Sequence, residues 1–214
     1  MQSKHSTGKI VSVCVSKPKI VEVNGELVST GIFKEPVSGR VQLRTLNLDG
    51  DEQADLTVHG GIDKALYSYP LEHYSWWQKQ LPDVEFPLGK FGENLTTTGL
   101  LETDVFIGDE FQMGTAIVKV SQPRLPCYKL GIKFGRRDVI KTFVQSGFSG
   151  IYFSVIQEGE LGVGDKIKFL GGDEYRISVS DVANLFNGKR ARDPDFIELC
   201  LRSQLAKQMK RFID

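Results

Sequence analysis

Residues 105–111 read Val-Phe-Ile-Gly-Asp-Glu-Phe, and residues 161–167 repeat the pattern as Leu-Gly-Val-Gly-Asp-Lys-Ile. In both copies a glycine and an aspartate interrupt a short apolar run. Glycine adopts backbone conformations that other residues avoid, so each copy predicts a strand–turn–strand corner of the kind that β-barrels use. Neither copy is a phosphate-binding loop, because both lack the required spacing and the Lys-Ser/Thr pair.

Short strands are predicted on both sides of these corners. Residues 9–15 alternate in polarity, which predicts a strand with Val11, Val13 and Val15 on one face. Asn24-Gly25 separates two short apolar runs and is a strong hairpin signal, because both residues tolerate positive φ. Further strands are expected at residues 20–23, 26–28, 41–46, 115–120 and 150–156. The pattern predicts a mainly β fold.

Two helices are expected within this β region, at residues 70–81 and 138–144. Pro70 suits the first position of a helix, where its missing N–H is not needed. Tyr74 and Trp77 belong to the apolar stripe of the first helix. His73 is expected at the rim of the protein rather than as a metal ligand.

The character of the chain changes after Arg176. Ser180 is expected to cap a helix over residues 181–186, and Asp193-Pro194 is expected to begin a helix that reaches about Lys207 or beyond. Residues 1–175 are therefore expected to form a β-barrel domain, and residues 176–214 a small helical appendage. This tail carries no residue group suited to catalysis, so we expect it to serve docking or assembly.

Composition narrows the function class. The 214 residues are 40% hydrophobic, and 27 Lys and Arg balance 27 Asp and Glu, so nothing favours binding to nucleic acid or an anionic membrane. No apolar run approaches the ~20 residues of a membrane span, and the N-terminus lacks the apolar core of a signal peptide. Three widely spaced cysteines form no disulfide framework, which favours a cytoplasmic location.

Residues 121–130, Ser-Gln-Pro-Arg-Leu-Pro-Cys-Tyr-Lys-Leu, hold the residue best suited to chemistry. The two prolines predict a rigid bend. Arg124 and Lys129 are near Cys127 in sequence, and cationic neighbours favour the thiolate, which attacks electrophiles and binds metals. The alternative is that Cys127 is a small buried apolar residue. Cys14 and Cys200 are expected to be structural.

Two further stretches place polar groups beside glycines. In His59-Gly60-Gly61 the glycines let a ligand approach the main chain, and His59 would donate to that ligand, act as an acid or cap the turn. Glu93 and Asn94 offer the acceptors and amide donors that recognise the edge of a heterocycle, or else form an Asx turn. Three nearby acidic residues are expected to be solvated turn residues: Asp49, Asp51 and Asp55.

Taken in order, His59-Gly60-Gly61, Gly92-Glu93-Asn94-Leu95 and Pro123-Arg124-Leu125-Pro126-Cys127 resemble the motifs of the MOSC family, named for the C-terminal domain of molybdenum cofactor sulfurase. The Gly108-Asp109 corner and the C-terminal helices make the chain similar to the YiiM-like subgroup. The resemblance covers nearly the whole chain. It implies a MOSC-type β-barrel with a molybdopterin-type cofactor in its mouth, followed by a C-terminal domain of three helices.

The resemblance also implies roles for individual residues. Cys127 corresponds to the cysteine that binds molybdenum, and it is the expected metal ligand and a catalytic residue. His59 and Glu93 are the other expected catalytic residues, as proton relays. The expected cofactor-binding residues are Cys127, Arg124, Asn94, Glu93, His59, Gly60 and Gly61.

The implied activity is that of a molybdoenzyme oxidoreductase. Its substrates would be N-hydroxylated compounds (hydroxylaminopurines, hydroxylamines and amidoximes), which it would reduce to the corresponding amines. The sequence has no ferredoxin cysteine spacing, so a separate flavoprotein or iron–sulfur protein is expected to deliver the electrons. The protein is expected to be a monomer or homodimer.

The chemistry of the residues agrees with these expectations but leaves alternatives open. A soft thiolate suits a thiolate-binding metal, whereas one cysteine and three scattered histidines have no zinc-site spacing. One alternative is a carrier of sulfur or of the molybdenum cofactor that uses a Cys127 persulfide without turnover. Another is a cysteine hydrolase in which Cys127 works with His59.

Overall fold

The computed structural model describes residues 7–55 and 60–213. The two Gly-Asp corners lead into β8 (Glu110–Met113) and β12 (Lys166–Gly171). Each corner contains the same hydrogen bond, in which the aspartate side chain accepts from the amide three residues before it. Asp109 Oδ2 accepts from Phe106 N at 3.0 Å, and Asp165 Oδ2 accepts from Gly162 N at 2.9 Å. The corner glycines have φ of +84° and +92°, a region that glycine adopts without strain. The prediction of two similar corners is confirmed.

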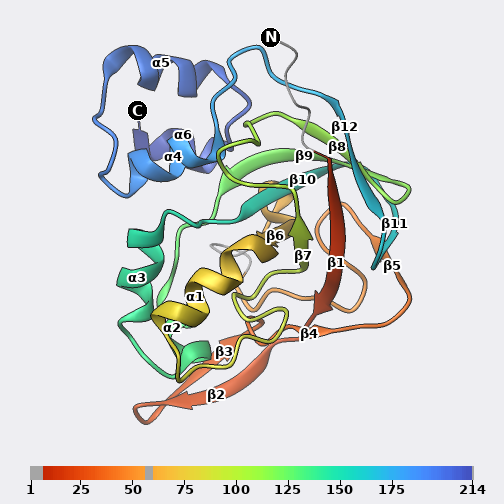
Figure 1. The fold of residues 1–214 in the computed structure, drawn as a ribbon, viewed down its shortest axis with the longest axis vertical. Coiled ribbons are helices and arrows are strands. Elements are labelled where there is room, and N and C mark those ends of the chain that lie inside the picture. The colour runs from red at the N-terminus through yellow and green to blue at the C-terminus, as the bar shows by residue number, and fades with distance from the viewer. Residues whose placement is uncertain (1–6, 56–59, 214) are drawn as a thin grey trace.

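Seven strands of the described chain close into a β-barrel (Figure 1). Around the ring they follow the order β12, β8, β9, β10, β6, β7 and β1, and β1 pairs back with β12. Only β6 and β7 are parallel neighbours among these described pairs. The remaining bounds are β1 Gly8–Val15, β6 Leu66–Pro70, β7 Leu95–Thr98, β9 Ala116–Pro123 and β10 Ile151–Gln157. The expected mainly β fold is thereby confirmed.

Two smaller strand pairs and one short strand flank the barrel. β2 (Lys19–Val23) and β3 (Glu26–Thr30) form the predicted hairpin, with positive φ at both turn residues. β4 (Glu35–Pro36) pairs with the end of β1. β5 (Arg40–Leu43) pairs with β11 (Gly159–Gly162). β5 ends before the predicted residue 46, because the chain turns after Leu43.

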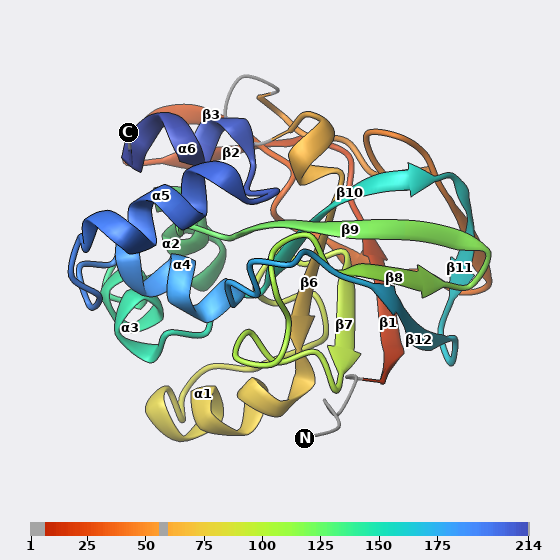
Figure 2. The ribbon, with the colours of Figure 1, turned by 90° about the horizontal axis from the view of Figure 1, so that it is seen from above.

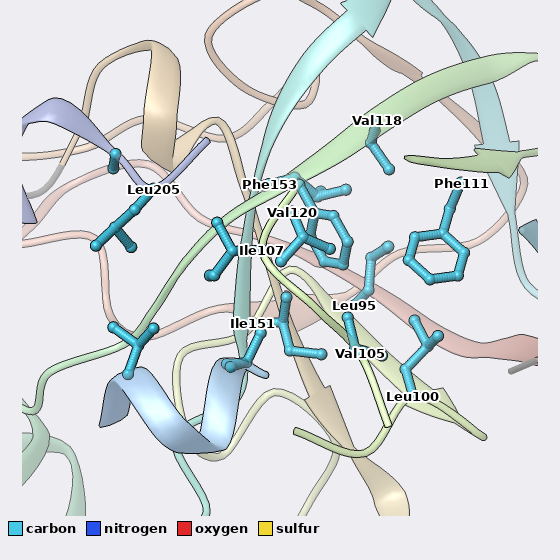
Figure 3. Close-up of a cluster of buried hydrophobic side chains, with 14 of the residues drawn as sticks. Leu95, Leu100, Val105, Ile107, Phe111, Val118, Val120, Ile151, Phe153 and Leu205 are labelled. Carbon is cyan, nitrogen blue, oxygen red and sulfur yellow. The ribbon is translucent and has the colours of Figure 1, made fainter. Parts of the chain in front are cut away.

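The barrel interior is filled by aliphatic and aromatic side chains from facing strands (Figure 3). Ile10 and Val13 of β1 belong to this core, whereas Val11 does not. The prediction of Val11, Val13 and Val15 on one face was therefore wrong for Val11. The pairing of β1 with β7 shifts register between Ile10 and Ser12, and this bulge reverses the alternation at that point.

A second cluster of buried residues lies outside the barrel, where helices cover strands. The helix predicted at 70–81 forms as η2 (Leu71–His73) and α1 (Tyr74–Gln80). Pro70 instead ends β6 with ψ of 129° and precedes the helix. Tyr74 and Trp77 are buried as expected, and they pack with Tyr69 and Phe91.

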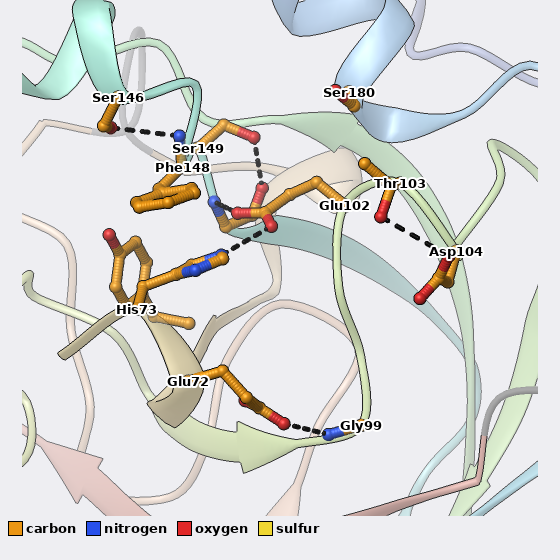
Figure 4. Close-up of polar contacts among 12 residues, drawn as sticks. Glu72, His73, Gly99, Glu102, Thr103, Asp104, Ser146, Phe148, Ser149 and Ser180 are labelled. Atoms are coloured by element: carbon orange, nitrogen blue, oxygen red, sulfur yellow. Dashed lines mark hydrogen bonds and ion pairs between the residues drawn. The ribbon is translucent and has the colours of Figure 1, made fainter. Parts of the chain in front are cut away.

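His73 is buried, so the expectation that it lies at the rim was wrong. Its Nε2 lies 2.7 Å from Glu102 Oε2, and its ring stacks on Phe148 at 3.7 Å between centroids (Figure 4). The other Glu102 oxygen accepts from Gly150 N at 2.7 Å. This pair joins the start of the first helix to the start of β10, which explains why a polar side chain is tolerated inside.

Two more helices cover this outer cluster. α3 (Val139–Ser146) matches the helix predicted at 138–144. α2 (Tyr128–Phe134) begins directly after Cys127 and was not predicted. Its buried Leu130 and Phe134 are four residues apart, and Gly135 ends it at φ +67°. This apolar spacing with a following glycine is a helix signal that the sequence does contain.

The C-terminal region forms α4 (Val179–Phe186), α5 (Pro194–Arg202) and α6 (Lys207–Ile213). The three helices lie together to one side of the barrel strands (Figure 2). The cap of α4 is Ser178 rather than the predicted Ser180, because the Ser178 hydroxyl accepts from Asp181 N at 3.0 Å. α5 ends before Lys207, since Ser203 is extended with ψ of 179°.

Side chains of the tail share one core with the barrel. Cys200, which the sequence assigns to the core, is fully buried, and Leu205 packs into the same cluster as Ile107 and Ile151 (Figure 3). The division into two domains at residue 175 stays a prediction. Within residues 7–55 and 60–213, every helix is too short or too polar to cross a membrane.

Candidate active site

A pocket lies beside the outward side of β10, between loops that follow β3, β5 and β9. Tyr152 forms part of its wall, whereas its neighbours Ile151 and Phe153 face the barrel interior. The lining residues in the described chain are Thr30, Gly31, Ile32, Lys34, Glu52, Gln53, Ala54, Gly92, Arg124, Cys127, Lys129 and Tyr152. Three of these side chains are cationic and one is anionic, so the wall favours an anionic ligand.

Cys127 reaches this pocket from the end of the Pro-rich bend. It is the N-terminal cap residue of α2, with an extended backbone, and it is partly exposed. All three cysteines of the chain are thiols, but Cys14 and Cys200 are fully buried. Burial raises the pKa of each of these two thiols to about 11, which opposes thiolate formation there. Cys127 is therefore the one of the three cysteines that lines the pocket.

Arg124 lies beside Cys127 and is only 7% exposed. Its guanidinium donates to the carbonyl oxygen of Phe91 and stands 5.0 Å from the centre of the Tyr67 ring. Among the described residues, no carboxylate forms an ion pair with it. A buried cation of this kind favours binding of an anion, because burial without a counter-charge is costly.

Lys34 supplies a second cation to the wall, and it was not predicted. Its ammonium group pairs with Asp51, which also accepts from Ser16 N at 2.9 Å. Burial lowers the pKa of Lys34, and the Asp51 carboxylate opposes this shift. Asp51 is 2% exposed, so the expectation that it is a solvated turn residue was wrong. It serves as the fixed counter-ion of a pocket lysine.

Asn94 lies behind the pocket wall and connects this ion pair to the barrel. Its Nδ2 donates to Asp51 Oδ2 at 2.9 Å, and its Oδ1 accepts from Tyr67 N at 3.2 Å. The side chain is 4% exposed and is absent from the described pocket lining. Its contacts fix Asp51, and through Asp51 they fix Lys34.

Glu93 is also behind the wall, with no exposed surface. One carboxylate oxygen accepts from the Tyr74 hydroxyl, from Gly89 N at 3.0 Å and from the Thr96 hydroxyl at 3.0 Å. The other accepts from Phe91 N at 2.9 Å. These bonds hold the 89–93 turn, which brings Gly92 to the pocket, so Glu93 shapes the wall from outside it.

Lys133 of α2 contacts the same turn behind the pocket wall that Glu93 holds. Its ammonium group donates to Ile32 O at 2.8 Å and to Gly89 O. Burial lowers its pKa to about 8. The lysine therefore joins the helix that follows Cys127 to two loops that line the pocket.

The third predicted motif lies only partly within the described chain. His59 is outside the described residues. Gly60 and Gly61 precede η1 (Ile62–Lys64), and Gly61 has φ of +96°, which favours glycine. A Cβ added at Gly61 would meet no described atom within 4 Å, so its main chain is open to approach. Neither glycine is among the described lining residues.

The sequence identified Cys127 and Arg124 but missed the residues that join them in the pocket. Lys34, Glu52 and Tyr152 come from three other parts of the chain. A lysine before Glu35-Pro36 carries no local signal of function. Only strand pairing brings these residues together.

Comparison with known proteins identifies a family and several relatives. The model of the MOSC domain family matches residues 55–168. Bacillus subtilis (strain 168) YflK is 42% identical over 200 residues, which cover 92% of this chain and 89% of YflK. Escherichia coli (strain K12) YiiM is 42% identical over 157 residues, which cover 72% of this chain and 65% of YiiM. A Gibberella moniliformis protein named a reductase is 30% identical over 185 residues, 85% of this chain but 33% of that protein.

Solved structures agree with the sequence comparisons. The crystal structure of YiiM from Geobacillus stearothermophilus superposes with a TM-score of 0.80 at 32% identity, covering 96% of this chain and 97% of that one. Its barrel with a helical appendage matches the fold described above. The resemblance carried by the three motifs is thereby confirmed. This chain belongs to the MOSC domain family, in its YiiM-like subgroup.

Proposed function

We propose that this protein is a molybdenum-cofactor-dependent reductase of N-hydroxylated compounds. Its substrates would be hydroxylaminopurines, hydroxylamines and amidoximes, and its products the corresponding amines, or amidines in the case of the amidoximes. One observation carries the proposal: the Cys127 thiol shares a pocket with Arg124, a buried cation that has no carboxylate partner in the described chain. The membership of the MOSC family and the reductase name of one relative support it.

The residues present fit such a cofactor. A soft thiolate suits a metal that prefers sulfur ligands, and Arg124, Lys34 and Lys129 suit the anionic groups of a molybdopterin. In the part of the chain that the structure describes, no group of three or more His, Cys, Asp and Glu side chains could hold a metal ion. A metal at Cys127 would take further ligands from the organic cofactor that the family implies.

The overall reaction is R–NHOH + 2 e⁻ + 2 H⁺ → R–NH₂ + H₂O. When bound, the cofactor would supply the two electrons that break the N–O bond. Cys127 would hold the metal, while Arg124 would bind anionic groups of the cofactor and orient it. Tyr152 would shield the reacting centre on the side of β10. His59 would supply a proton to the leaving oxygen.

Glu93 and Asn94 would act mainly by positioning. The four hydrogen bonds of Glu93 hold Gly92 at the pocket, and Asn94 fixes the Asp51–Lys34 pair. Both were expected to contact the cofactor, and Glu93 was expected to relay protons. Gly60 and Gly61 would bind the cofactor through their main chain, and the space around Gly61 is open.

The electron donor would be a separate flavoprotein or iron–sulfur protein. Cys14 and Cys200 are buried in the protein core, and the three cysteines of these 214 residues lack ferredoxin spacing. We propose a cytoplasmic setting, where such thiols stay reduced. Neither a nucleic acid nor a membrane is a proposed partner, and the protein would act as a monomer or homodimer.

The test begins with protein purified from a host that makes the molybdenum cofactor. We expect molybdenum and pterin in stoichiometric amounts, and no turnover of hydroxylaminopurine with NAD(P)H alone. Addition of an electron-transfer flavoprotein should then yield the amine. Turnover by the chain with NAD(P)H alone would contradict the separate donor. Metal-free protein that cleaves acyl or thioester substrates would instead identify a hydrolase.

A further inference from the structure

The strand that leads to Cys127 contains a β-bulge at Ser121. In the pairing of β9 with β10, Val120 lies opposite Phe153 and Gln122 lies opposite Tyr152, so Ser121 is the extra residue. A bulge bends its strand and changes the direction of the chain beyond it. The segment that carries Arg124 and Cys127 to the pocket therefore departs from this point.

The C-terminal tail pairs with β9 just beyond the part of β9 that pairs with β8. Val120 exchanges hydrogen bonds of 2.9 Å with the Gly108-Asp109 corner before β8. At the next residue the partner changes, because Ser121 O accepts from Ala206 N at 3.1 Å. Leu205, directly before Ala206, is 3% exposed and packs into the barrel core (Figure 3). The tail thus covers an edge of β9 that would otherwise be unpaired.

The same point is tied to the pocket wall and to η1. Ser121 Oγ lies 2.6 Å from Asp63 O and 3.0 Å from Tyr152 O, and the Tyr152 side chain lines the pocket. From α6, Gln208 Oε1 accepts from Lys64 Nζ at 2.8 Å. Since η1 directly follows Gly60-Gly61, the tail contacts two segments near the predicted site motifs: Ala206 pairs with β9 at Ser121, and Gln208 of α6 pairs with η1.

We propose that Ala206 and α6 together position the pocket, with Ser121 of β9 and Gln208 of α6 as the positioning residues. The tail would fix the bulge that sets the direction of the segment with Arg124 and Cys127. It would also fix the position of η1, which directly follows Gly60-Gly61. This role differs from the docking or assembly expected from the sequence. The expected effect on turnover rests on the proposed function. The effect of the tail on the conformation of the bulge and of η1 does not depend on it.

A matched pair of variants isolates this coupling. Gln208→Ala removes the contact with Lys64 of η1. Gln204→Ala removes a similar contact, an exposed hydrogen bond of 2.8 Å from Lys119 Nζ to Gln204 Oε1, which joins the tail to β9 rather than to η1. Both replace a tail glutamine that pairs with a lysine of the barrel domain. Gln208→Glu keeps an acceptor for Lys64 and serves as the rescue variant.

The first measurement is hydrogen exchange on cofactor-free protein. In Gln208→Ala we expect the amide of Lys64, which pairs with Gly61 O, to exchange about three to ten times faster than in the parent. Gln204→Ala and Gln208→Glu should leave it nearly unchanged. Ser121→Ala should accelerate exchange in both residues 61–65 and 122–128. Equal exchange of Lys64 in Gln208→Ala and Gln204→Ala would overturn the proposal.

The second measurement is turnover per molybdenum-loaded molecule. Because Gln208 acts on geometry, kcat of Gln208→Ala should fall about tenfold with little change in melting temperature, and Gln208→Glu should restore it. A parent without N-hydroxy reductase activity would refute the proposed function, and the exchange result would still decide the coupling. An active parent whose Gln208→Ala variant keeps the kcat of Gln204→Ala would overturn the positioning role.

Discussion

The barrel interior and the pocket beside it share strand β10 but are stabilised differently. On β10, Phe153 packs into the interior, while its neighbour Tyr152 lines the pocket. The interior depends on burial of apolar side chains. The pocket wall depends on buried charges with dedicated partners, such as Asp51 with Lys34. Alternation along a strand lets adjacent residues serve stability and chemistry separately, so the two regions should respond differently to substitution.

The largest difference should come from the cysteines. Cys127→Ser replaces a soft thiolate by a hydroxyl of similar shape, so we expect near-normal melting but a loss of N-hydroxy reduction of about a thousandfold or more. Turnover should be measured per folded, cofactor-loaded molecule. Cys14→Ser and Cys200→Ser are the controls, since both thiols are buried away from the pocket lining.

The controls are expected to lose stability without losing turnover by this measure. If Cys127 were only a packed residue, Cys127→Ser would cost about 1–2 kcal/mol of stability and leave activity measurable. A Cys127→Ser protein with parental turnover would rule out the proposed mechanism. It would also remove the functional contrast between the two regions.

A cavity in the interior should cost the most stability. Phe111 of β8 is 1% exposed and packs against Phe169 at 5.8 Å between ring centres. Phe111→Ala should lower the free energy of unfolding by about 3–5 kcal/mol, as measured in urea. Because Phe111 is not among the pocket residues, turnover per folded molecule should be unchanged. A matching loss of turnover would show that the two regions are not separable.

Removal of a charge from the pocket wall should come next. Asp51→Ala leaves Lys34 buried without its counter-ion, removes the side-chain acceptor of Ser16 N and removes one of the two acceptors of Asn94 Nδ2. We expect the unfolding free energy to fall by about 3 kcal/mol. Glu35→Ala, which breaks the exposed Lys19–Glu35 pair, is the control and should have a far smaller effect. Similar losses in the two variants would argue against a charge-stabilised wall.

The smallest expected effect is a pH dependence from Lys133. Burial lowers its pKa from 10.5 to about 8, so in that interval the native lysine is neutral while the unfolded one is still protonated. The unfolded state then binds more protons, and the stability contributed by this residue rises with pH. The unfolding free energy of the parent minus that of Lys133→Met should therefore increase from about pH 8 to about pH 10. A difference that is flat or falls over this range would contradict the assignment.

Much of the fold could be predicted because its signals are local. The Gly-Asp corners, the Asn24-Gly25 hairpin and the Asp193-Pro194 helix start each depend on a backbone preference of one or two residues. Errors arose where neighbouring structure changed the local pattern. The β1 bulge moved Val11 off the interior face, and the hydroxyl of Ser178 rather than Ser180 met the first turn of α4.

The sequence by itself determined the barrel corners, the helical tail, and the segment in which Arg124 and Cys127 lie three residues apart. Tertiary structure alone decided that Lys34 and Tyr152 share their pocket and that Glu93 and Asn94 stand behind its wall. It also decided that Ala206, the residue before α6, pairs with Ser121. The physical reason is that local preferences act between neighbours, whereas strand pairing and barrel closure bring together residues with no sequence signal in common.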